Sequence, residues 1–447
     1  MKEKHMFSNK DLVKLLIPLI VEQLLNSLMG TVDTIMVSNV GSEAISAVSL
    51  VDSICVLVIQ VFSALAAGGV IVCSQYIGRK DEKAANKAAS QVVFTVTSIS
   101  VTLTILCMVL RKPLLRVIFG SIEPGVMAAA QIYFFFMALS FPFIALYNAG
   151  SSIFRAQKNT RTPMVISTIS NGINIAGNAL LIWGLHLGVA GAALATLASR
   201  MFCAIVVLWY LRKPQNTICV CNYRKIRPDF PLIKRILAIG IPSGVENGMF
   251  QFGKLAIQST VSTLGTAAIA AQAMANIMEN VNGVGAVGVG IGLMTVVGQC
   301  IGAGRRDEAK YYIKKLTIIA EVTIIISCLF VFLITRPVTI LGGMEKESAD
   351  LCMYMVTWIT IVKPISWTLS FIPAYGMRAA GDVKFSMIVS CVTMWLCRVS
   401  LCVFLCRVMG FGPIAVWIGM FADWTVRGII FTIRFYSGKW ALHHVIQ

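Results

Sequence analysis

The chain has few charged residues. Asp, Glu, Lys and Arg make up 13% of its 447 residues, whereas a typical soluble domain has about 25%. Hydrophobic residues make up 57%, and the mean hydropathy is +0.80. Apolar runs of roughly 20 residues or more recur along the whole length, which is enough to cross a hydrocarbon core about 30 Å thick. The composition therefore excludes an ordinary soluble protein and predicts an integral membrane protein.

Motifs for catalysis and for nucleotide binding are missing or misplaced. An intramembrane enzyme, the alternative from another functional class, would need a nucleophile–base pair or a metal motif such as HExxH. The four histidines all lie in predicted loops or tails: His5, His186, His443 and His444. The sequence has no P-loop, and we expect no cofactor. A GxGxxG pattern from Gly283 to Gly288 lies inside an apolar run, without the preceding strand of a dinucleotide site, so it predicts close helix packing.

Acidic residues are scarcer than basic ones. The chain has 20 acidic and 38 basic residues, which gives a net charge of +18. Lys and Arg gather in alternate loops such as 79–87 and 305–310, whereas loops such as 186–188 and 263–266 contain neither. This is the positive-inside pattern of membrane proteins. It predicts that both termini are cytoplasmic and argues against nucleic acid as a partner.

Twelve apolar segments are long enough to be transmembrane helices. They cover residues 11–37, 44–73, 88–110, 126–153, 163–186, 188–211, 234–263, 267–298, 311–335, 348–376, 385–408 and 411–436. The segments of about 10 alternating residues that a membrane β-barrel requires are missing. The expected fold class is therefore an all-α integral membrane protein with twelve transmembrane helices.

The second half of the chain repeats the first. Identical residues recur at an offset of 224 positions: Pro18 and Pro242, Glu22 and Glu246, Gly41 and Gly265, Gly188 and Gly412. Six spans in each half give both copies the same orientation, so we expect two six-helix bundles related by a pseudo-twofold axis along the membrane normal. The predicted parts are an N-terminal lobe (1–211), a basic cytoplasmic linker (212–233) and a C-terminal lobe (234–447).

Ionisable side chains within the spans mark candidate functional positions, because a charge at membrane depth is costly. Asp33 lies about 28 Å along a helix from Lys14, and its repeat position holds Ile257 instead of a carboxylate. We therefore assign Asp33 to a site in the N-terminal half, and the repeated Glu22 and Glu246 to shared architecture or gating. The alternatives are an interfacial carboxylate that reaches water at Asp33 and bundle-closing hydrogen bonds at the glutamates.

Three asparagines follow one face of the fifth span. Asn171, Asn174 and Asn178 recur at intervals of three and four residues, so they share one side of a helix. Their amide oxygens can bind a cation or orient a carboxylate, and the alternative is hydrogen bonding between helices. The corresponding stretch of the second half has no such amides. Met29 and Met36 in the first span are candidates for an adaptable substrate cavity, with ordinary packing as the alternative.

Several motifs resemble the multidrug and toxin extrusion (MATE) family. They are GTVDTIMV at residues 30–37, SQYIGRKD at 74–81 and VGQCIGAG at 297–304, together with RAQ at 155–157 and TP at 162–163. The similarity covers essentially the whole chain. It implies a monomeric transporter of the bacterial inner membrane, surrounded by lipids, that exports organic cations or drugs in exchange for Na⁺ or H⁺ by rocking of two lobes. A flippase for lipid-linked precursors is the alternative in the same superfamily; it should have further spans and a cationic cavity.

The resemblance also implies a coupling site. Asp33 matches the acidic residue of the first helix that the family uses for cation coupling, and Asn174 and Asn178 match positions around it. The DinF-like branch usually has Asp at the position of Asn178, so the chain is more similar to the NorM-like branch. An amide cannot titrate but can offer an oxygen to a hard cation, which favours Na⁺ over H⁺. Substrate-binding or gating roles are expected for Glu22, Glu246, Asn171, Met29 and Met36.

Overall fold

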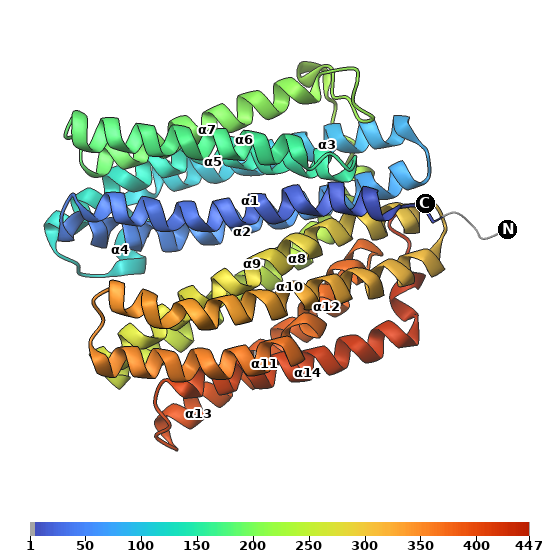
Figure 1. Cartoon of the computed structure of the whole chain (residues 1–447). Coiled ribbons are helices and arrows are strands. Elements are labelled where there is room, and N and C mark those ends of the chain that lie inside the picture. The colour runs from blue at the N-terminus through green and yellow to red at the C-terminus, as the bar shows by residue number, and fades with distance from the viewer. Residues whose placement is uncertain (1–4, 447) are drawn as a thin grey trace. The chain divides into compact units, whose positions relative to one another are not determined.

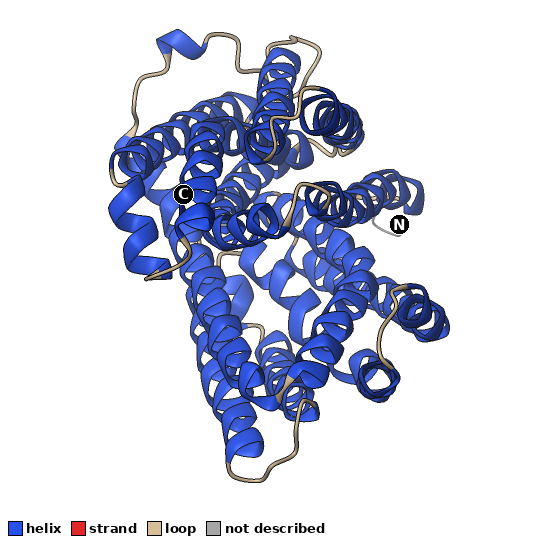
Figure 2. Ribbon diagram, turned by 90° about the vertical axis from the view of Figure 1, so that its left-hand side faces the viewer, coloured by secondary structure: helices blue, strands red, loops and turns tan. Residues whose placement is uncertain are grey.

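The computed structural model describes residues 5–446, and all regular elements in this range are helices (Figures 1 and 2). The first half contains α1 (Asn9–Ser38), α2 (Ser42–Gly78), α3 (Glu82–Val109), α4 (Arg111–Phe119), α5 (Pro124–Ala156), α6 (Arg161–Asn178), η1 (Ala179–Gly184) and α7 (Val189–Leu211). After η2 (Tyr223–Lys225), the second half contains α8 (Phe230–Val261), η3 (Ser262–Leu264), α9 (Thr266–Gly302), α10 (Arg306–Leu341), α11 (Lys346–Ala379), α12 (Val383–Thr393), η4 (Met394–Ser400), α13 (Leu401–Arg407), α14 (Ile414–Ser437) and η5 (Lys439–Leu442).

Eleven spans within residues 5–446 are long and apolar enough to cross a membrane. One of them joins α6 to the π-helical η1, and another joins α12, the π-helical η4 and α13. The long helix outside this set is α8, which carries Lys234, Arg235, Glu246 and Lys254. Its 32 residues coincide with the seventh predicted span. Together with α8, these elements account for all twelve predicted spans, whereas the short helix α4 was not predicted.

Glycines at equivalent repeat positions shape the bends of both halves. Gly41 and Gly265 precede α2 and α9 with φ angles of 136° and 98°. Gly188 and Gly412 precede α7 and α14 with φ angles of 60° and 73°. Side chains with a Cβ atom rarely adopt such angles. The sequence repeat therefore reflects a backbone geometry that is repeated as well.

Contacts between residues divide the chain into two units. Unit 2 contains Leu25–Gly244, and unit 1 contains the chain up to Leu24 and from Val245 onward. Both boundaries fall inside helices, α1 and α8. The division by contacts thus differs from the predicted lobes, 1–211 and 234–447, in the assignment of the first part of α1 and the first part of α8.

The two units use the same helix pairings. In unit 2, α5 packs against α2, α3 and α7, and in unit 1, α11 packs against α9, α10 and α14. The pairs α2 with α3 and α9 with α10 also correspond. In the repeat, α5 is equivalent to α11 and α7 to α14. The duplication inferred from the sequence is therefore found again in the packing of each unit.

The glycine-rich motif of the second half lies inside α9, as its packing interpretation requires. A Cβ atom at Gly288 would lie 3.1 Å from the backbone N and Cα of Ile20 in α1, within unit 1. A Cβ atom at Gly285 would lie 2.9 Å from a methyl group of Thr323 in α10. Only small residues permit helix backbones to approach this closely. The interpretation as a packing motif is confirmed.

Candidate functional site

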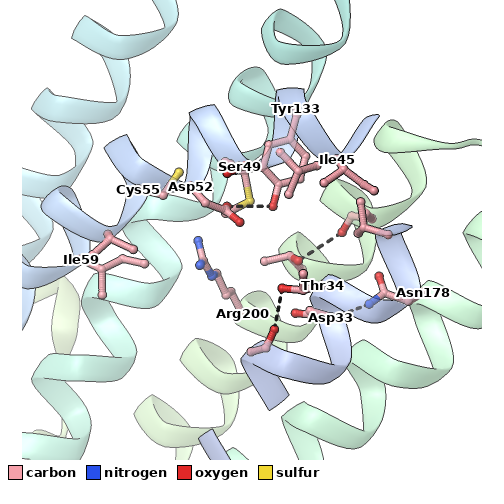
Figure 3. Close-up of a pocket in the computed structure, with 17 residues that line it drawn as sticks. Asp33, Thr34, Ile45, Ser49, Asp52, Cys55, Ile59, Tyr133, Asn178 and Arg200 are labelled. Carbon is pink, nitrogen blue, oxygen red and sulfur yellow. Dashed lines mark hydrogen bonds between the residues drawn. The ribbon is translucent and has the colours of Figure 1, made fainter. Parts of the chain in front are cut away.

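A pocket of about 420 Å³ lies within unit 2, where α1, α2, α5, α6 and α7 meet. Small-molecule sites in proteins commonly have volumes of about 300–1,000 Å³. The side chains of Asp33, Asp52 and Arg200 point toward the same space (Figure 3). Apolar residues of α1 and α2 supply much of the remaining wall. The pocket therefore combines charged groups with an apolar lining inside a membrane-spanning bundle.

Asn178 links α6 to α1 at one end of this pocket. Its Nδ2 atom donates to Asp33 Oδ1 at 2.6 Å and to Asn174 Oδ1 at 2.9 Å. The Nδ2 atom of Asn174 lies 3.5 Å from Thr196 Oγ1 in α7. The four-residue spacing places Asn174 and Asn178 on one face of α6. The structure thus brings together the three residues predicted to couple a cation, while the coupling role itself stays a prediction.

The side-chain oxygen of Asn178 has no hydrogen-bond partner among the described residues, although Asn178 is only 1% exposed. Leaving a buried polar atom without a partner costs about 1–3 kcal/mol, and such atoms are rare. Carboxylate and amide oxygens are typical ligands of hard cations. An unpartnered oxygen on the same amide group that donates to Asp33 is therefore a candidate ligand for a small cation such as Na⁺.

The other predicted residues of the first and fifth spans lie farther from this centre. Met36 is buried, and its Sδ atom lies 4.0 Å from Asn178 Nδ2. Asn171 donates to Asn26 Oδ1 at 3.4 Å and so connects α6 to α1 outside the pocket lining. Met29 does not line this pocket either. Only Met36 accompanies the coupling residues, and substrate roles for Asn171 and Met29 stay predictions.

The repeated glutamates are buried but do not line the pocket. Glu22 and Glu246 are 1% and 4% exposed, so neither side chain is exposed toward lipid. Glu246 accepts a hydrogen bond from Arg378 Nη2 at 2.5 Å within unit 1. A paired and hydrogen-bonded charge is the usual form in which a carboxylate is buried. The gating roles proposed for these glutamates stay predictions.

Three residues of the pocket were missed in the sequence analysis: Asp52, Tyr133 and Arg200. The Tyr133 hydroxyl donates to Asp52 Oδ1 at 3.1 Å, and Arg200 Nη1 donates to Ser140 Oγ at 2.7 Å. Asp52 and Arg200 lie inside apolar spans, so the cost of a charge at membrane depth should have marked both of them. Tyr133 carries no comparable signal, because tyrosine is common near the ends of membrane helices.

Several charged side chains inside unit 1 are paired with one another. Asp423 accepts from Arg427 at 2.8 Å and from Arg398 at 2.6 Å. Lys363 Nζ lies 2.6 Å from Glu279 Oε1. Asp423 and Arg427 lie four residues apart on α14, which places them on one helix face. Arg398 reaches Asp423 from η4 as its second partner.

Comparisons with known sequences cover both halves of the chain. A family model described as MatE matches residues 18–180 and 242–404, two segments that are 224 positions apart. A probable multidrug resistance protein NorM from Thermotoga maritima is 26% identical, over 100% of this chain and 96% of its own length. An uncharacterized transporter, YisQ from Bacillus subtilis, is 25% identical over 95% of this chain and 93% of its own length.

Solved structures share the same fold. A crystal structure of MATE in complex with MaL6 has a TM-score of 0.90 and 21% identity, over 96% of this chain and 97% of that chain. The outward-facing conformation of a multidrug resistance MATE family transporter of the MOP superfamily has a TM-score of 0.88 and 21% identity, over 96% of each chain. These similarities extend over the whole arrangement of helices.

Proposed function

The chain belongs to the MatE family, whose members are membrane transporters and not enzymes, and we propose that this transporter is a multidrug efflux antiporter. It exports organic cations or amphiphilic drugs in exchange for Na⁺. Two features support the proposal: the resistance protein from Thermotoga maritima is similar over the full length, and the pocket of unit 2 combines carboxylates with apolar walls. An apolar wall suits the body of an amphiphilic drug, and a carboxylate suits its charge.

The coupling ion binds at Asp33 in this proposal. The observation that carries it is the buried, unpartnered oxygen of Asn178, whose amide group is hydrogen bonded to Asp33. An amide keeps this oxygen available at any pH, because it does not titrate. A hard cation would bind the Asp33 carboxylate together with the Asn178 oxygen. This donor set favours Na⁺ over H⁺.

Exchange requires that the ion prefers one state of the carrier. Na⁺ at Asp33 would favour the state that releases drug outside, and so reset the carrier for the next cycle. A ligand shifts such an equilibrium only by its difference in affinity for the two states. A shift from 1:99 to 99:1 requires a preference of about 10⁴-fold. The same ion must therefore bind much more weakly in the opposite state.

Efflux from proteoliposomes loaded with a fluorescent monocation such as ethidium tests the proposal. Three gradients are imposed separately: Na⁺ alone, a pH difference alone, and neither. We expect the Na⁺ gradient to accelerate efflux and the pH gradient alone to have little effect. If wild-type efflux in Na⁺-free vesicles follows the pH gradient at full rate, Na⁺ coupling is wrong. If neither gradient changes efflux, the antiporter proposal is wrong.

The flippase alternative would require further spans and a cationic cavity. The long helices of residues 5–446 correspond to the twelve predicted spans. The pocket is lined by two carboxylates, Asp33 and Asp52, and one guanidinium group, Arg200. This balance favours a cationic substrate.

We further propose a monomer in the bacterial inner membrane with both termini in the cytoplasm. Cys221 tests the orientation, because this exposed thiol lies in the linker between the two halves. A membrane-impermeant maleimide should label Cys221 in inverted vesicles but not in intact cells. Labelling of Cys221 in intact cells would reverse the topology. A Cys221→Ser variant controls for labelling of other thiols.

A further inference from the structure

Arg200 is the single fixed cation among the residues that line the pocket of unit 2, beside the two carboxylates of Asp33 and Asp52. We propose that Arg200 sets the valence of this pocket, so that it accepts one monovalent cation at a time and rejects dications. The proposal rests on the proposed function, because it takes the pocket with Asp33 as the transport site. It adds a selectivity rule and a residue that determines it.

Neutral groups hold both carboxylates. Asp33 accepts from the Asn178 amide at 2.6 Å, and Asp52 accepts from the Tyr133 hydroxyl at 3.1 Å. Neither donor carries charge, so neither cancels the charge of the carboxylate it binds. Asp33 and Asp52 both line the same pocket. Without a further group, the pocket would present two negative charges to its contents.

Arg200 supplies the compensating charge without closing the pocket. Its guanidinium group donates to the neutral Ser140 hydroxyl at 2.7 Å, which orients it from α7. It lines the same pocket as Asp33 and Asp52, yet it forms no direct ion pair with either one within the described part of the chain. Figure 3 shows the guanidinium group and both carboxylates around the same open space. All three charges therefore act on whatever occupies that space.

The sum of these charges selects the occupant. Two carboxylates and one guanidinium group leave one negative charge, which a single monovalent cation neutralises. Electrostatic energies are large inside a protein, because the effective dielectric constant is well below that of water. A dication would leave an unbalanced positive charge, which is costly at membrane depth. Na⁺ and an organic monocation satisfy the same rule and would therefore compete for the pocket.

The rule predicts compensation between two substitutions. Arg200→Gln leaves two negative charges and should favour dications over monocations by at least tenfold relative to the wild type. Asp52→Asn leaves no net charge and should weaken monocation binding by at least tenfold, although Asp33 and Asn178 are intact. The double variant regains a single negative charge, so its monocation affinity should return to within about threefold of the wild type. Arg200→Lys keeps the charge and should keep the preference.

Binding to the full-length protein in nanodiscs tests this rule by isothermal titration with tetraphenylphosphonium as the monocation and methyl viologen as the dication. Arg336→Gln is the matched control, because Arg336 forms an exposed pair with Asp350 outside the pocket. Thermal unfolding of each variant shows whether it is folded. An unchanged ratio of the two affinities in folded Arg200→Gln, or no recovery in the double variant, would overturn the proposal.

Asp33→Asn separates this proposal from the proposed function. If Asp33→Asn leaves monocation binding unchanged, the pocket is not the transport site, and both proposals fail together. If Asp33→Asn abolishes binding while the exchanges at Arg200 and Asp52 leave selectivity unchanged, the transport site stands and only the valence rule fails. If Arg200→Gln does not fold, Arg200→Lys and Asp52→Asn still test the valence rule. Arg200→Lys must keep the preference for monocations over dications, and Asp52→Asn must bind monocations more weakly than the wild type does.

Discussion

The two units treat buried carboxylates in different ways. In unit 1, three carboxylates within the spans form ion pairs with basic side chains at 2.5–2.8 Å: Glu246, Glu279 and Asp423. In unit 2, Asp33 and Asp52 are instead held by an amide and a phenol. A carboxylate that faces a fixed cation is already neutralised, whereas one held by neutral donors keeps its charge for a ligand.

The difference shows that repeat position alone does not decide the role of a charge. Both units descend from one repeated plan and use the same helix pairings. The partner of each carboxylate separates a group that stabilises the fold from a group that can bind an ion. Substitution of a carboxylate should therefore mainly impair ion binding in unit 2 and mainly destabilise the fold in unit 1.

The largest expected effect is the loss of transport in Asp33→Asn. Removing the charge should reduce gradient-driven efflux to the level of protein-free vesicles, because the remaining charges of Asp52 and Arg200 leave the pocket without a net negative charge. Expression and thermal unfolding should stay near wild type, since no fixed cation loses its partner. Asp350→Asn, in an exposed ion pair, is the matched control. If Asp33→Asn exports substrate at the wild-type rate, at equal protein levels, then Asp33 does not bind the coupling ion, and the proposed difference between the two units is wrong.

Asp423→Asn should instead damage the fold of unit 1. The substitution leaves Arg398 and Arg427 buried without a carboxylate, and breaking a buried pair in this way costs about 3–5 kcal/mol. Thermal unfolding in detergent should show a clearly lower melting temperature than wild type. Replacing Arg398 by Met in the same chain should recover part of the loss, because one unpaired charge is removed. Equal melting temperatures for Asp423→Asn and Asp33→Asn would contradict the distinction.

A more moderate effect is expected for Asn178→Asp, which gives the site a second carboxylate next to Asp33. Two carboxylates at hydrogen-bond distance hold a proton more readily than one does. Efflux should therefore become severalfold more dependent on an imposed pH gradient and less dependent on Na⁺, with a shifted pH optimum. The ion-swap assay in proteoliposomes measures both dependences. A variant with unchanged ion dependence would exclude Asn178 from the coupling site.

The smallest effect is expected outside the membrane, at the linker. Lys87 lowers the pKa of Asp229 through an ion pair at 2.5 Å. Because the folded pKa lies below the unfolded value of about 3.9, the pair stabilises the linker above that value and ceases to do so as the pH falls through the folded pKa. Lys87→Ala should therefore reduce hydrogen-exchange protection near Asp229 slightly at pH 7, and this effect should disappear as the pH falls through the folded pKa of Asp229. If Lys87→Ala destabilised the protein as much as Asp423→Asn does, exposure to solvent would not weaken such ion pairs.

Local patterns in the sequence predicted much of the architecture. Hydropathy identified the spans, and identical residues at one offset identified the repeat. The spacing of the asparagines placed Asn174 and Asn178 on one helix face, whereas their position beside Asp33 was implied by the resemblance to the MATE family. Partners such as Arg378 for Glu246 were not accessible, since no local rule determines which distant helices meet. Arg398 was harder still, because it lies in the π-helical η4, where the usual 3.6-residue periodicity does not hold.

The positive φ angles at Gly41 and Gly265 have an evolutionary meaning. A duplicated gene begins with two identical copies, and every later difference between them is a separate event. Here both copies retain the same bend, while the position of Asp33 in one copy is Ile257 in the other, packed in an apolar cluster. The inherited part is thus the path of the backbone, and the side-chain chemistry is what changed. Duplication supplied a second scaffold, which was then free to specialise.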